Sequence, residues 1–469
     1  MEYISTRGAA PVLDFEQVTL TGLAGDGGLY LPREWPRFSK ADIAALRGLP
    51  YAQLATRIML PFVRGSLEEG ELAAMCERAY GRFAHAAVTP LAQLDERHFL
   101  LELFHGPTLA FKDVALQLLG QLFEAFLARS GEHLTIVGAT SGDTGSAAID
   151  AVAGREGVDI FMLHPAGRVS DVQRRQMTTV RAPNVHNIAV DGASFDDAQA
   201  MVKRMFGDPA LTDTLRIGAV NSINWARLMA QVVYYFAAAL ALGAPYRRVA
   251  FSVPTGNFGA VFAGYVAARM GLPVERLIVA TNVNDILHRA LSEGDYSAGT
   301  VTPTAAPSMD IQVSSNFERL LFDAGGRDAG ALSAQMRRFD KARALVLEPG
   351  QRNAIAELFT SCRADPGEMA ATMAWAREAC DQVIDPHTAI GLHAAREAAS
   401  DLPADVSLVT LATAHPAKFR DAVERATGTR PALPPRVGDL FDREERCDTL
   451  PADYEKVRDY VLARSGGRG

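Results

Sequence analysis

The feature that most constrains the fold of this 469-residue chain is a regular alternation of short apolar segments with helical segments, from about residue 96 to residue 430. Each apolar segment has the length and the Val, Ile and Leu content of a buried strand. Strands separated by helices are typical of βαβ units, so the sequence predicts an α/β fold with parallel twisted sheets. The expected strands are Leu134–Val137, Asp159–Leu163, Val185–Val190, Val249–Val253, Leu277–Thr281 and Ser407–Leu411.

The length of the chain and its first 95 residues indicate more than one domain. A chain of 469 residues is too long for a single compact core. Residues 1–95 combine a glycine-rich turn, Gly25–Gly28, with helical patterns over Ala52–Leu60 and Leu67–Phe83. We therefore expect an added α+β domain at the amino terminus, followed by a core over residues 96–430.

Two further regions have less regular patterns. The segment from about 295 to 375 is rich in Ala, Gly, Ser and Pro, and we interpret it as helices and loops that cover the core. Residues 431–469 contain the charged stretch Asp442–Arg446. This composition is typical of a solvated carboxy-terminal extension.

Composition excludes several classes of partner. The net charge of −8 provides no basic field for nucleic acid or anionic lipid. No apolar run is long enough to span a bilayer, and the first residues lack a signal pattern, so a cytoplasmic location is expected. The four cysteines are scattered and predict neither a metal site nor a disulfide framework; they are Cys76, Cys362, Cys380 and Cys447. Nothing in the sequence distinguishes a monomer from a homodimer.

Lys112 is the best candidate for a nucleophile that forms a Schiff base. It stands at the start of a segment with apolar residues at helical spacing, namely Ala115, Leu118, Leu119, Leu122 and Phe126. Burial at such a position lowers the pKa of a lysine, because the charged form loses its hydration. The alternative is a solvated surface lysine, as most lysines are.

A glycine-containing loop after the strand Val249–Val253 is a candidate phosphate site. The loop Pro254–Gly259 leads into a helical pattern that runs from Ala260 to about Met270. Free backbone amides and the positive end of a helix suit a phosphate monoester. The loop lacks the endings of nucleotide-binding motifs, so a small cofactor's phosphate is the favoured ligand. A glycine-rich helix cap without a ligand is the alternative.

A second possible anion site combines two segments. The loop Gly138–Gly145 follows the strand Leu134–Val137 and offers hydroxyls, free amides and the carboxylate of Asp143. The segment Asn221–Arg227 begins another helix, and because helical side chains lean toward the amino end, Arg227 can reach the opening beside Asn221 and Ser222. Helix capping and a surface ion pair are the alternatives for these residues.

Several sequence runs then identify a family resemblance. In order from residue 105 to residue 419 the chain contains HGPTLAFKD, ATSGDTGSAA, NSINWAR, PTGNFG, TNVNDIL, DPHTAIG and LATAHPAKF, and near the start it contains YISTRG and DGGLYLP. Together these runs closely resemble the threonine synthase family of pyridoxal-phosphate enzymes, in its longer form. The resemblance implies fold type II, similar to tryptophan synthase β: two lobes, the smaller at roughly residues 130–215, that close over the cofactor.

The resemblance also implies roles for individual residues. Lys112 matches the Schiff-base lysine, and Thr413 matches the hydroxyl at the pyridine nitrogen. Asp143 stands where shorter relatives have an asparagine near the cofactor's 3-hydroxyl, which leaves its role open. The implied phosphate loop is Thr255, Gly256, Asn257, Phe258 and Gly259, and the implied substrate-binding residues are Ser141, Thr144, Asn221, Ser222 and Arg227.

The implied reaction converts O-phospho-L-homoserine and water to L-threonine and phosphate, by γ-elimination and β-addition of water, as the last step of threonine biosynthesis. The nearest alternative is a phospho-lyase on the same scaffold that gives 2-oxobutyrate, ammonia and phosphate. A serine or threonine dehydratase has no need of a site for a leaving phosphate, and a silent binding protein has no need of Lys112. His105 and His415 lie beside the motifs, where a core or loop-capping histidine is the commoner case.

Overall fold

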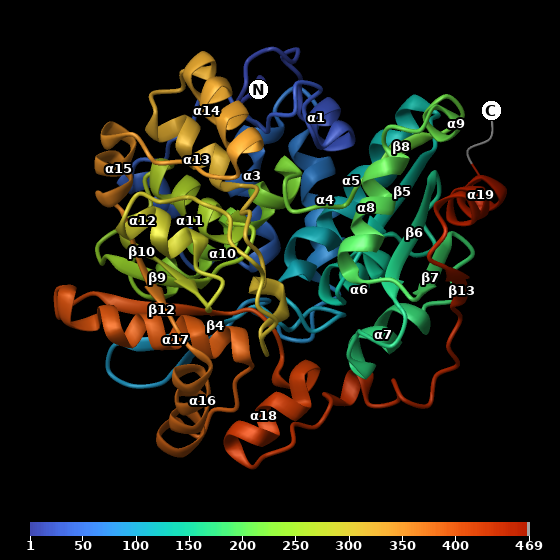
Figure 1. Cartoon of the computed structure of the whole chain (residues 1–469). Helices are drawn as coiled ribbons and strands as arrows, with labels where there is room; N and C mark the ends of the chain where they lie inside the picture. Colours follow the sequence, from blue (N-terminus) through green and yellow to red (C-terminus); the bar gives the residue numbers. More distant parts are fainter. Residues whose placement is uncertain (467–469) are drawn as a thin grey trace.

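The structure is a computed structural model that describes residues 1–466. Its centre is a six-stranded sheet with the strand order β11-β10-β9-β12-β4-β3 (Figure 1). All neighbouring strands are parallel except β3, which pairs antiparallel with β4. The strands of this larger sheet are β3 (Leu91–Gln93), β4 (His98–Glu102), β9 (Val249–Pro254), β10 (Val274–Thr281), β11 (Phe359–Arg363) and β12 (Ser407–Ala412).

The two faces of the larger sheet differ in the size of their side chains. Phe251 and Val253 of β9 belong to the main core with α10 (Trp225–Ala241) and α11 (Gly259–Arg269), whereas Ala250 packs with α17 (Pro386–Ala398). Small residues on the second face let α17 lie close to the sheet, and the Ser252 hydroxyl donates to the carbonyl of Gly391 in α17 at 2.6 Å. Since successive side chains of a strand point to opposite faces, the sheet is covered on both sides.

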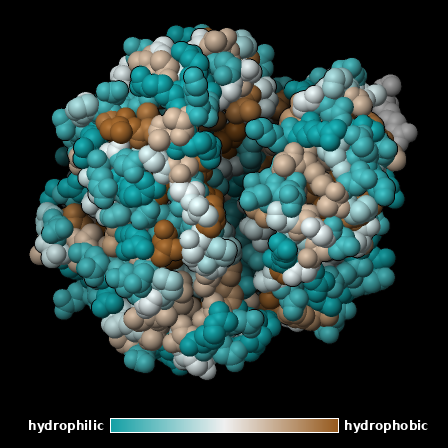
Figure 2. Space-filling model, in the orientation of Figure 1, coloured by the Kyte–Doolittle hydropathy of each residue, from teal (hydrophilic) through white to brown (hydrophobic). Residues whose placement is uncertain are grey.

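A second, smaller sheet has five parallel strands in the order β13-β7-β6-β5-β8. Its central strand β6 is buried at every position, as expected for a parallel strand covered on both faces. The smaller sheet is built from β5 (Leu134–Ala139), β6 (Val158–Pro165), β7 (Val185–Asp191), β8 (Arg216–Gly218) and β13 (Asp448–Pro451). Figure 2 shows a groove between the part of the molecule that holds this sheet and the part that holds the larger one.

The expectation of a solvated carboxy-terminal extension is wrong for residues 448–464. Strand β13 pairs with β7, and α19 (Tyr454–Arg464) buries Val457 and Val461 in the core of the smaller sheet. The charged stretch before them is also bound, because Glu445 pairs with two arginines of α7 (Asp171–Thr178). Ion pairs and a narrow apolar stripe attach this segment to the smaller sheet and to α7. The segment has no continuous apolar run of the kind that indicates burial in a sequence.

The amino-terminal region shares its core with the rest of the chain. Strands β1 (Tyr3–Ser5) and β2 (Tyr30–Pro32) form a small antiparallel pair. The rings of Tyr3 and Phe62 contact Trp225 of α10, and Phe15 contacts Phe126. The domain boundaries at residues 95 and 430 therefore stay an interpretation of the sequence. The helices of this region are α1 (Phe15–Thr21), α2 (Lys40–Ala45), α3 (Tyr51–Val63) and α4 (Glu69–Tyr80).

All six strands that the sequence predicts are present. The segment from about 295 to 375 is helical as expected, but it also contributes β11, a short and partly polar strand at the edge of the larger sheet. No helix within residues 1–466 is long and apolar enough to cross a membrane. The remaining α-helices are α5 (Lys112–Ser130), α6 (Asp143–Val152), α8 (Phe195–Met205), α9 (Pro209–Thr212), α12 (Ile286–Ser292), α13 (Phe317–Ala324), α14 (Ala329–Ala342), α15 (Pro349–Ala356), α16 (Pro366–Cys380) and α18 (Arg420–Thr427).

Candidate active site

Most of the predicted site residues follow the carboxyl ends of β5, β9 and β12, as expected for ligand sites in parallel sheets, whereas Lys112 follows β4 and Asn221, Ser222 and Arg227 follow β8. Lys112 is the first residue of α5 and is 8% exposed. The loop before it is attached to the loop after β12, because the Phe111 amide donates to the carbonyl of Thr413 at 2.8 Å. Lys112 and Thr413 are thereby held near each other.

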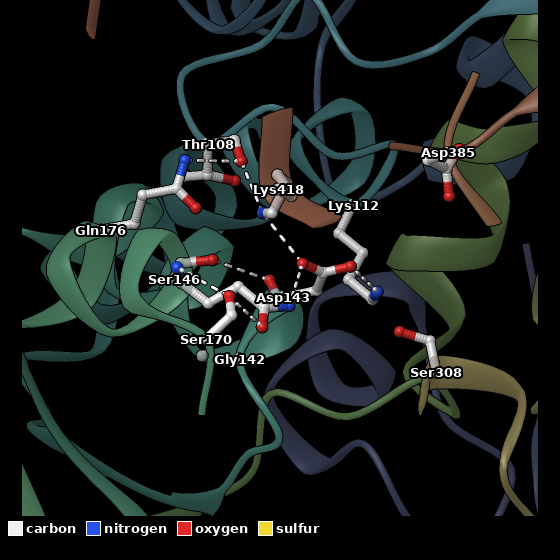
Figure 3. A network of polar contacts seen from close by, with 12 residues as sticks. Thr108, Lys112, Gly142, Asp143, Ser146, Ser170, Gln176, Ser308, Asp385 and Lys418 are labelled. Carbon is white, nitrogen blue, oxygen red and sulfur yellow. Dashed lines mark hydrogen bonds and ion pairs between the residues drawn. The ribbon is translucent and has the colours of Figure 1, made fainter. Parts of the chain in front are cut away.

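A buried network of charges surrounds Lys112 (Figure 3). The Nζ atom of Lys112 lies 3.4 Å from Oδ2 of Asp143, and the Nζ atom of Lys418 lies 2.9 Å from Oδ1 of the same carboxylate. Gln173 donates to Oδ1 at 2.8 Å, and Lys418 also donates to the carbonyl of Thr108 at 2.7 Å. Asp143 is thus coordinated by two lysines and an amide.

The surroundings of Lys112 lower its pKa below that of a surface lysine. Burial lowers the pKa of Lys112; Asp143 opposes that shift, whereas the positive charges of Lys418 and Arg227 add to it. Burial acts to raise the pKa of Asp143, but Lys418, Lys112 and the amide of Gln173 together outweigh burial and hold that pKa below its ordinary value. The result is an ionised carboxylate beside a lysine that gives up its proton more readily than a surface lysine does.

The candidate phosphate loop packs closely against the segment that contains Ser308. A Cβ atom at Gly256 would lie 2.5 Å from the carbonyl oxygen of Ser308, so the loop approaches this segment more closely than a larger residue allows. Phe258 adopts a left-handed conformation with φ of 62° and turns the chain into α11. The carbonyl of Gly256 accepts from Ser314, and that of Asn257 accepts from Asn316.

The amides of this loop are free to bind an anion. Within residues 1–466, no hydrogen bond uses the amide of Gly256, Asn257, Phe258 or Gly259 as its donor. These amides stand at the amino end of α11, where the helix dipole is positive. The hydroxyl of Thr255 is already used, since it donates to the carbonyl of Val253 at 2.6 Å.

Arg227 is a buried cation without partners for two of its nitrogens. It is 4% exposed, and its Nε and Nη1 atoms are buried with no hydrogen-bond partner among the described residues. Burial lowers the pKa of Arg227 to about 10, which still leaves it charged at neutral pH. A buried, charged and unsatisfied donor is costly unless a ligand completes it.

The other predicted substrate residues differ in burial and in their contacts. Asn221 and Ser222 are half-buried, and the carbonyl of Ser222 accepts from Asn316, the residue that also holds the phosphate loop. Thr144 is half-buried in the first turn of α6, whereas Ser141 is exposed at its start. The expectation of free amides in this loop is partly wrong, because the Thr140 hydroxyl accepts from the amides of Gly142 and Gly145.

Sequence reasoning missed several residues of the site. Lys418 lies in one of the runs that carry the family resemblance, but its contact with Asp143 depends on how distant loops meet. Ser308, Ser314 and Asn316 lie in the segment that helical periodicity did not resolve. Their only sequence signal is a set of polar residues that interrupts a helical region.

The histidines and Asp113 have structural contacts. The ring Nδ1 of His415 accepts from the amide of Ala417, which caps a short helix at Pro416–Phe419. His105 pairs with Glu102 at 2.7 Å. Asp113 accepts from both the amide and the hydroxyl of Thr108, and burial raises the pKa of Asp113 to about 6. Asp113 therefore fixes the loop before Lys112 in addition to lying in the first turn of α5.

Comparisons with known proteins identify the family to which the chain belongs. Family models described as "Threonine synthase N terminus", "Pyridoxal-phosphate dependent enzyme" and "Threonine synthase, C-terminal" match residues 2–80, 83–350 and 388–461. Threonine synthase from Pseudomonas aeruginosa is 55% identical and covers 100% of this chain and 99% of its own.

Solved structures give the same result. The crystal structure of PLP-bound threonine synthase from Brucella melitensis is 52% identical, covers 99% of this chain and 100% of its own, and has a TM-score of 0.97. Threonine synthase from yeast is 38% identical, covers 99% of this chain and 98% of its own, and has a TM-score of 0.95. The chain belongs to the threonine synthase family of pyridoxal-phosphate-dependent enzymes.

Proposed function

We propose that this enzyme converts O-phospho-L-homoserine and water to L-threonine and phosphate, with Lys112 as the cofactor-binding lysine and Arg227 as the main ligand of the leaving phosphate. The observation that carries this proposal is the buried guanidinium of Arg227, which has two nitrogens without partners and whose positive charge helps to lower the pKa of Lys112. A dianionic phosphate ester near Lys112 satisfies such a group with charge-assisted hydrogen bonds.

The residues present fit pyridoxal phosphate. The free amides from Gly256 to Gly259 and the amino end of α11 would hold its phosphate, in a loop where a Cβ atom at Gly256 has no room. Lys112 would hold its aldehyde, and the hydroxyl of Thr413, on the loop after β12, would face its ring nitrogen. When bound, the cofactor supplies an electron sink for the pair left at the substrate's α-carbon.

Lys112 would then act as the general base of the reaction. Its amine stands at the start of a helix, and burial lowers its pKa, which favours a role in taking a proton from the α-carbon and passing protons between the α, β and γ carbons. Arg227, with donors from Asn221 and Ser222, would bind the phosphate more strongly as negative charge builds on it. Ser141 and Thr144 are proposed to bind the amino-acid end of the substrate, and Asp143 to lie beside the cofactor.

Product analysis tests the proposal. The enzyme loaded with pyridoxal phosphate is given O-phospho-L-homoserine, and threonine, phosphate and 2-oxobutyrate are measured together. We expect threonine and phosphate in equal amounts, and a loss of at least about a thousandfold in Lys112→Ala, because one group serves several proton transfers. Equal amounts of 2-oxobutyrate and phosphate indicate the phospho-lyase instead, and an undiminished rate in Lys112→Ala overturns the assignment of Lys112.

A further inference from the structure

The ammonium group of Lys418 is buried in the active site although no step of the proposed reaction uses it. Its side chain is 0% exposed, and its Nζ atom contacts the carbonyl of Thr108 at 2.7 Å and Oδ1 of Asp143 at 2.9 Å. Burying a lysine costs free energy unless its charge is paired. Lys418 meets this cost by pairing with Asp143, which places a second positive charge in the network around Lys112.

The two oxygens of Asp143 have different partners (Figure 3). Oδ1 accepts from Lys418 and Gln173, whereas Oδ2 faces Lys112 at 3.4 Å. Lys418 is itself fixed, because it lies on the short helix Pro416–Phe419 capped by His415 and also donates to the loop that precedes Lys112. The carboxylate is thus held from one side and directed at Lys112 from the other.

We propose that Lys418 is a positioning residue: it holds Asp143 as a carboxylate directed at Lys112 and balances that carboxylate's charge, so that the amine of Lys112 releases its proton more readily. The inference rests on the proposed role of Lys112. It assigns Lys418 an electrostatic effect at a distance and no contact with the reacting atoms.

The sign of the effect follows from the charges around the two groups. Lys112 faces the negative charge of Asp143 and the positive charges of Lys418 and Arg227, and Asp143 faces both lysines and the amide of Gln173. Removal of Lys418 leaves Asp143 to act on Lys112 alone and also removes a repulsive charge, so both changes favour the protonated amine. Removal of Asp143 together with Lys418 takes away one charge of each sign.

The test measures the protonation of Lys112 itself. The full chain freed of cofactor is labelled with formaldehyde and a mild reductant across a pH series, and the rate of methylation of Lys112 is followed by peptide mass spectrometry. The variants are Lys418→Met, Asp143→Asn and the double variant, all close in shape to the wild type. Lys203→Met, at an exposed lysine of α8, is the matched control.

We expect Lys418→Met to raise the pH midpoint of Lys112 labelling by about one unit, a tenfold change in protonation, and Asp143→Asn to lower it. The double variant is expected to have a midpoint between those of the two single variants, and Lys203→Met is expected to leave the midpoint unchanged. The pH at which the absorbance of the bound cofactor changes is expected to move in the same order in the loaded enzyme.

A midpoint that stays unchanged in folded Lys418→Met overturns the proposal. If Lys418→Met does not fold, Asp143→Asn and the double variant are compared instead, because they differ only at Lys418. Equal labelling midpoints in these two variants also overturn the proposal. Because labelling needs neither substrate nor turnover, a failure of this test is distinct from a failure of the proposed reaction, which product analysis and Lys112→Ala decide separately.

Discussion

At the scale of single residues, two buried arginines show how a binding group differs from a structural one. Arg319 is fully buried, and its guanidinium donates to the carbonyls of Tyr30 and Ile223. Arg227 is nearly as buried but has two nitrogens without partners. The first is satisfied by the fold itself, whereas the second needs a ligand.

This difference predicts opposite effects on stability. Replacing Arg227 by Met is expected to raise the free energy of unfolding of the ligand-free protein by about 1 to 3 kcal/mol, because a costly unpaired charge is removed. The same variant should lose at least about a hundredfold in kcat/KM for the phosphorylated substrate. Urea unfolding and steady-state kinetics measure the two effects.

Arg319→Met is the matched control for this prediction. It is expected to lower the free energy of unfolding by about 3 kcal/mol, since it leaves buried carbonyls without a donor. Equal destabilisation by the two substitutions contradicts the assignment of Arg227 to ligand binding.

His415 makes the stability of the enzyme depend on pH. Burial lowers the pKa of His415 to about 4, with a further contribution from the positive charge of Arg436. A base with a depressed pKa stabilises the fold above its unfolded pKa of about 6.5, and this contribution is lost as the pH falls toward 4. His415→Asn keeps an acceptor for the amide of Ala417 but does not titrate.

We therefore expect the free energy of unfolding to fall more steeply with acidification in the wild type than in His415→Asn, by up to about 3 kcal/mol over this range. Urea unfolding across the pH range measures both slopes. If the free energy of unfolding depends on pH equally in the wild type and in His415→Asn, His415 is not a neutral buried histidine.

At the scale of elements, the phosphate loop owes its shape to a segment that is distant in sequence. The stretch from Ser308 to Asn316 lies behind the loop, where the carbonyl of Ser308 leaves no room for a side chain at Gly256. Asn316 joins the loop to the segment that carries Ser222, since it donates to carbonyls of both. A change in one loop is therefore transmitted to the other.

Gly256→Ala tests whether this close packing fixes the phosphate loop. The added Cβ atom meets backbone that cannot move alone, so we expect the loop to shift and the affinity for pyridoxal phosphate to fall about tenfold or more. Titration of the cofactor by absorbance measures it. Gly350→Ala, at a helical glycine where an added Cβ atom meets open space, is the control and should leave the affinity unchanged. Unchanged affinity in Gly256→Ala contradicts a tight loop.

At the scale of the whole molecule, the carboxy-terminal segment completes the smaller sheet. Strand β13 extends the sheet beside β7, and α19 covers the face formed by Phe161 and Ile188. The last part of the chain thus stabilises the same sheet from which Asp143 and its loop extend. We therefore expect a truncation in this region to affect the active site through the sheet.

A substitution in α19 tests this coupling. Val457 is 0% exposed, and Val457→Ala is expected to lower the free energy of unfolding by about 1 to 3 kcal/mol through a cavity. The substitution should accelerate hydrogen exchange more in β6 and β7 than in β9 and β12, because the cavity lies against the smaller sheet. Lys456→Ala, at the exposed neighbouring position, is the control. Equal exchange in both sheets contradicts this view.

The sequence by itself determined six strands of the two larger sheets and placed Lys112 at the start of a helix. The six strands, the start of α5 at Lys112 and the glycine loop before α11 are confirmed because their signals are local: apolar periodicity, length and turn residues. The strand at Phe359–Arg363 was not anticipated because it is short, partly polar and lies at an edge. The roles of the site residues stay a prediction until the experiments above are done.

The tertiary structure alone decided which groups meet. The contact of Lys418 with Asp143, the bridge made by Asn316 and the addition of β13 to the smaller sheet all depend on strand order. Strand order follows from how whole faces pack and not from any one segment. That packing brings together charges that are distant in sequence. Local sequence patterns therefore do not predict which charges pair.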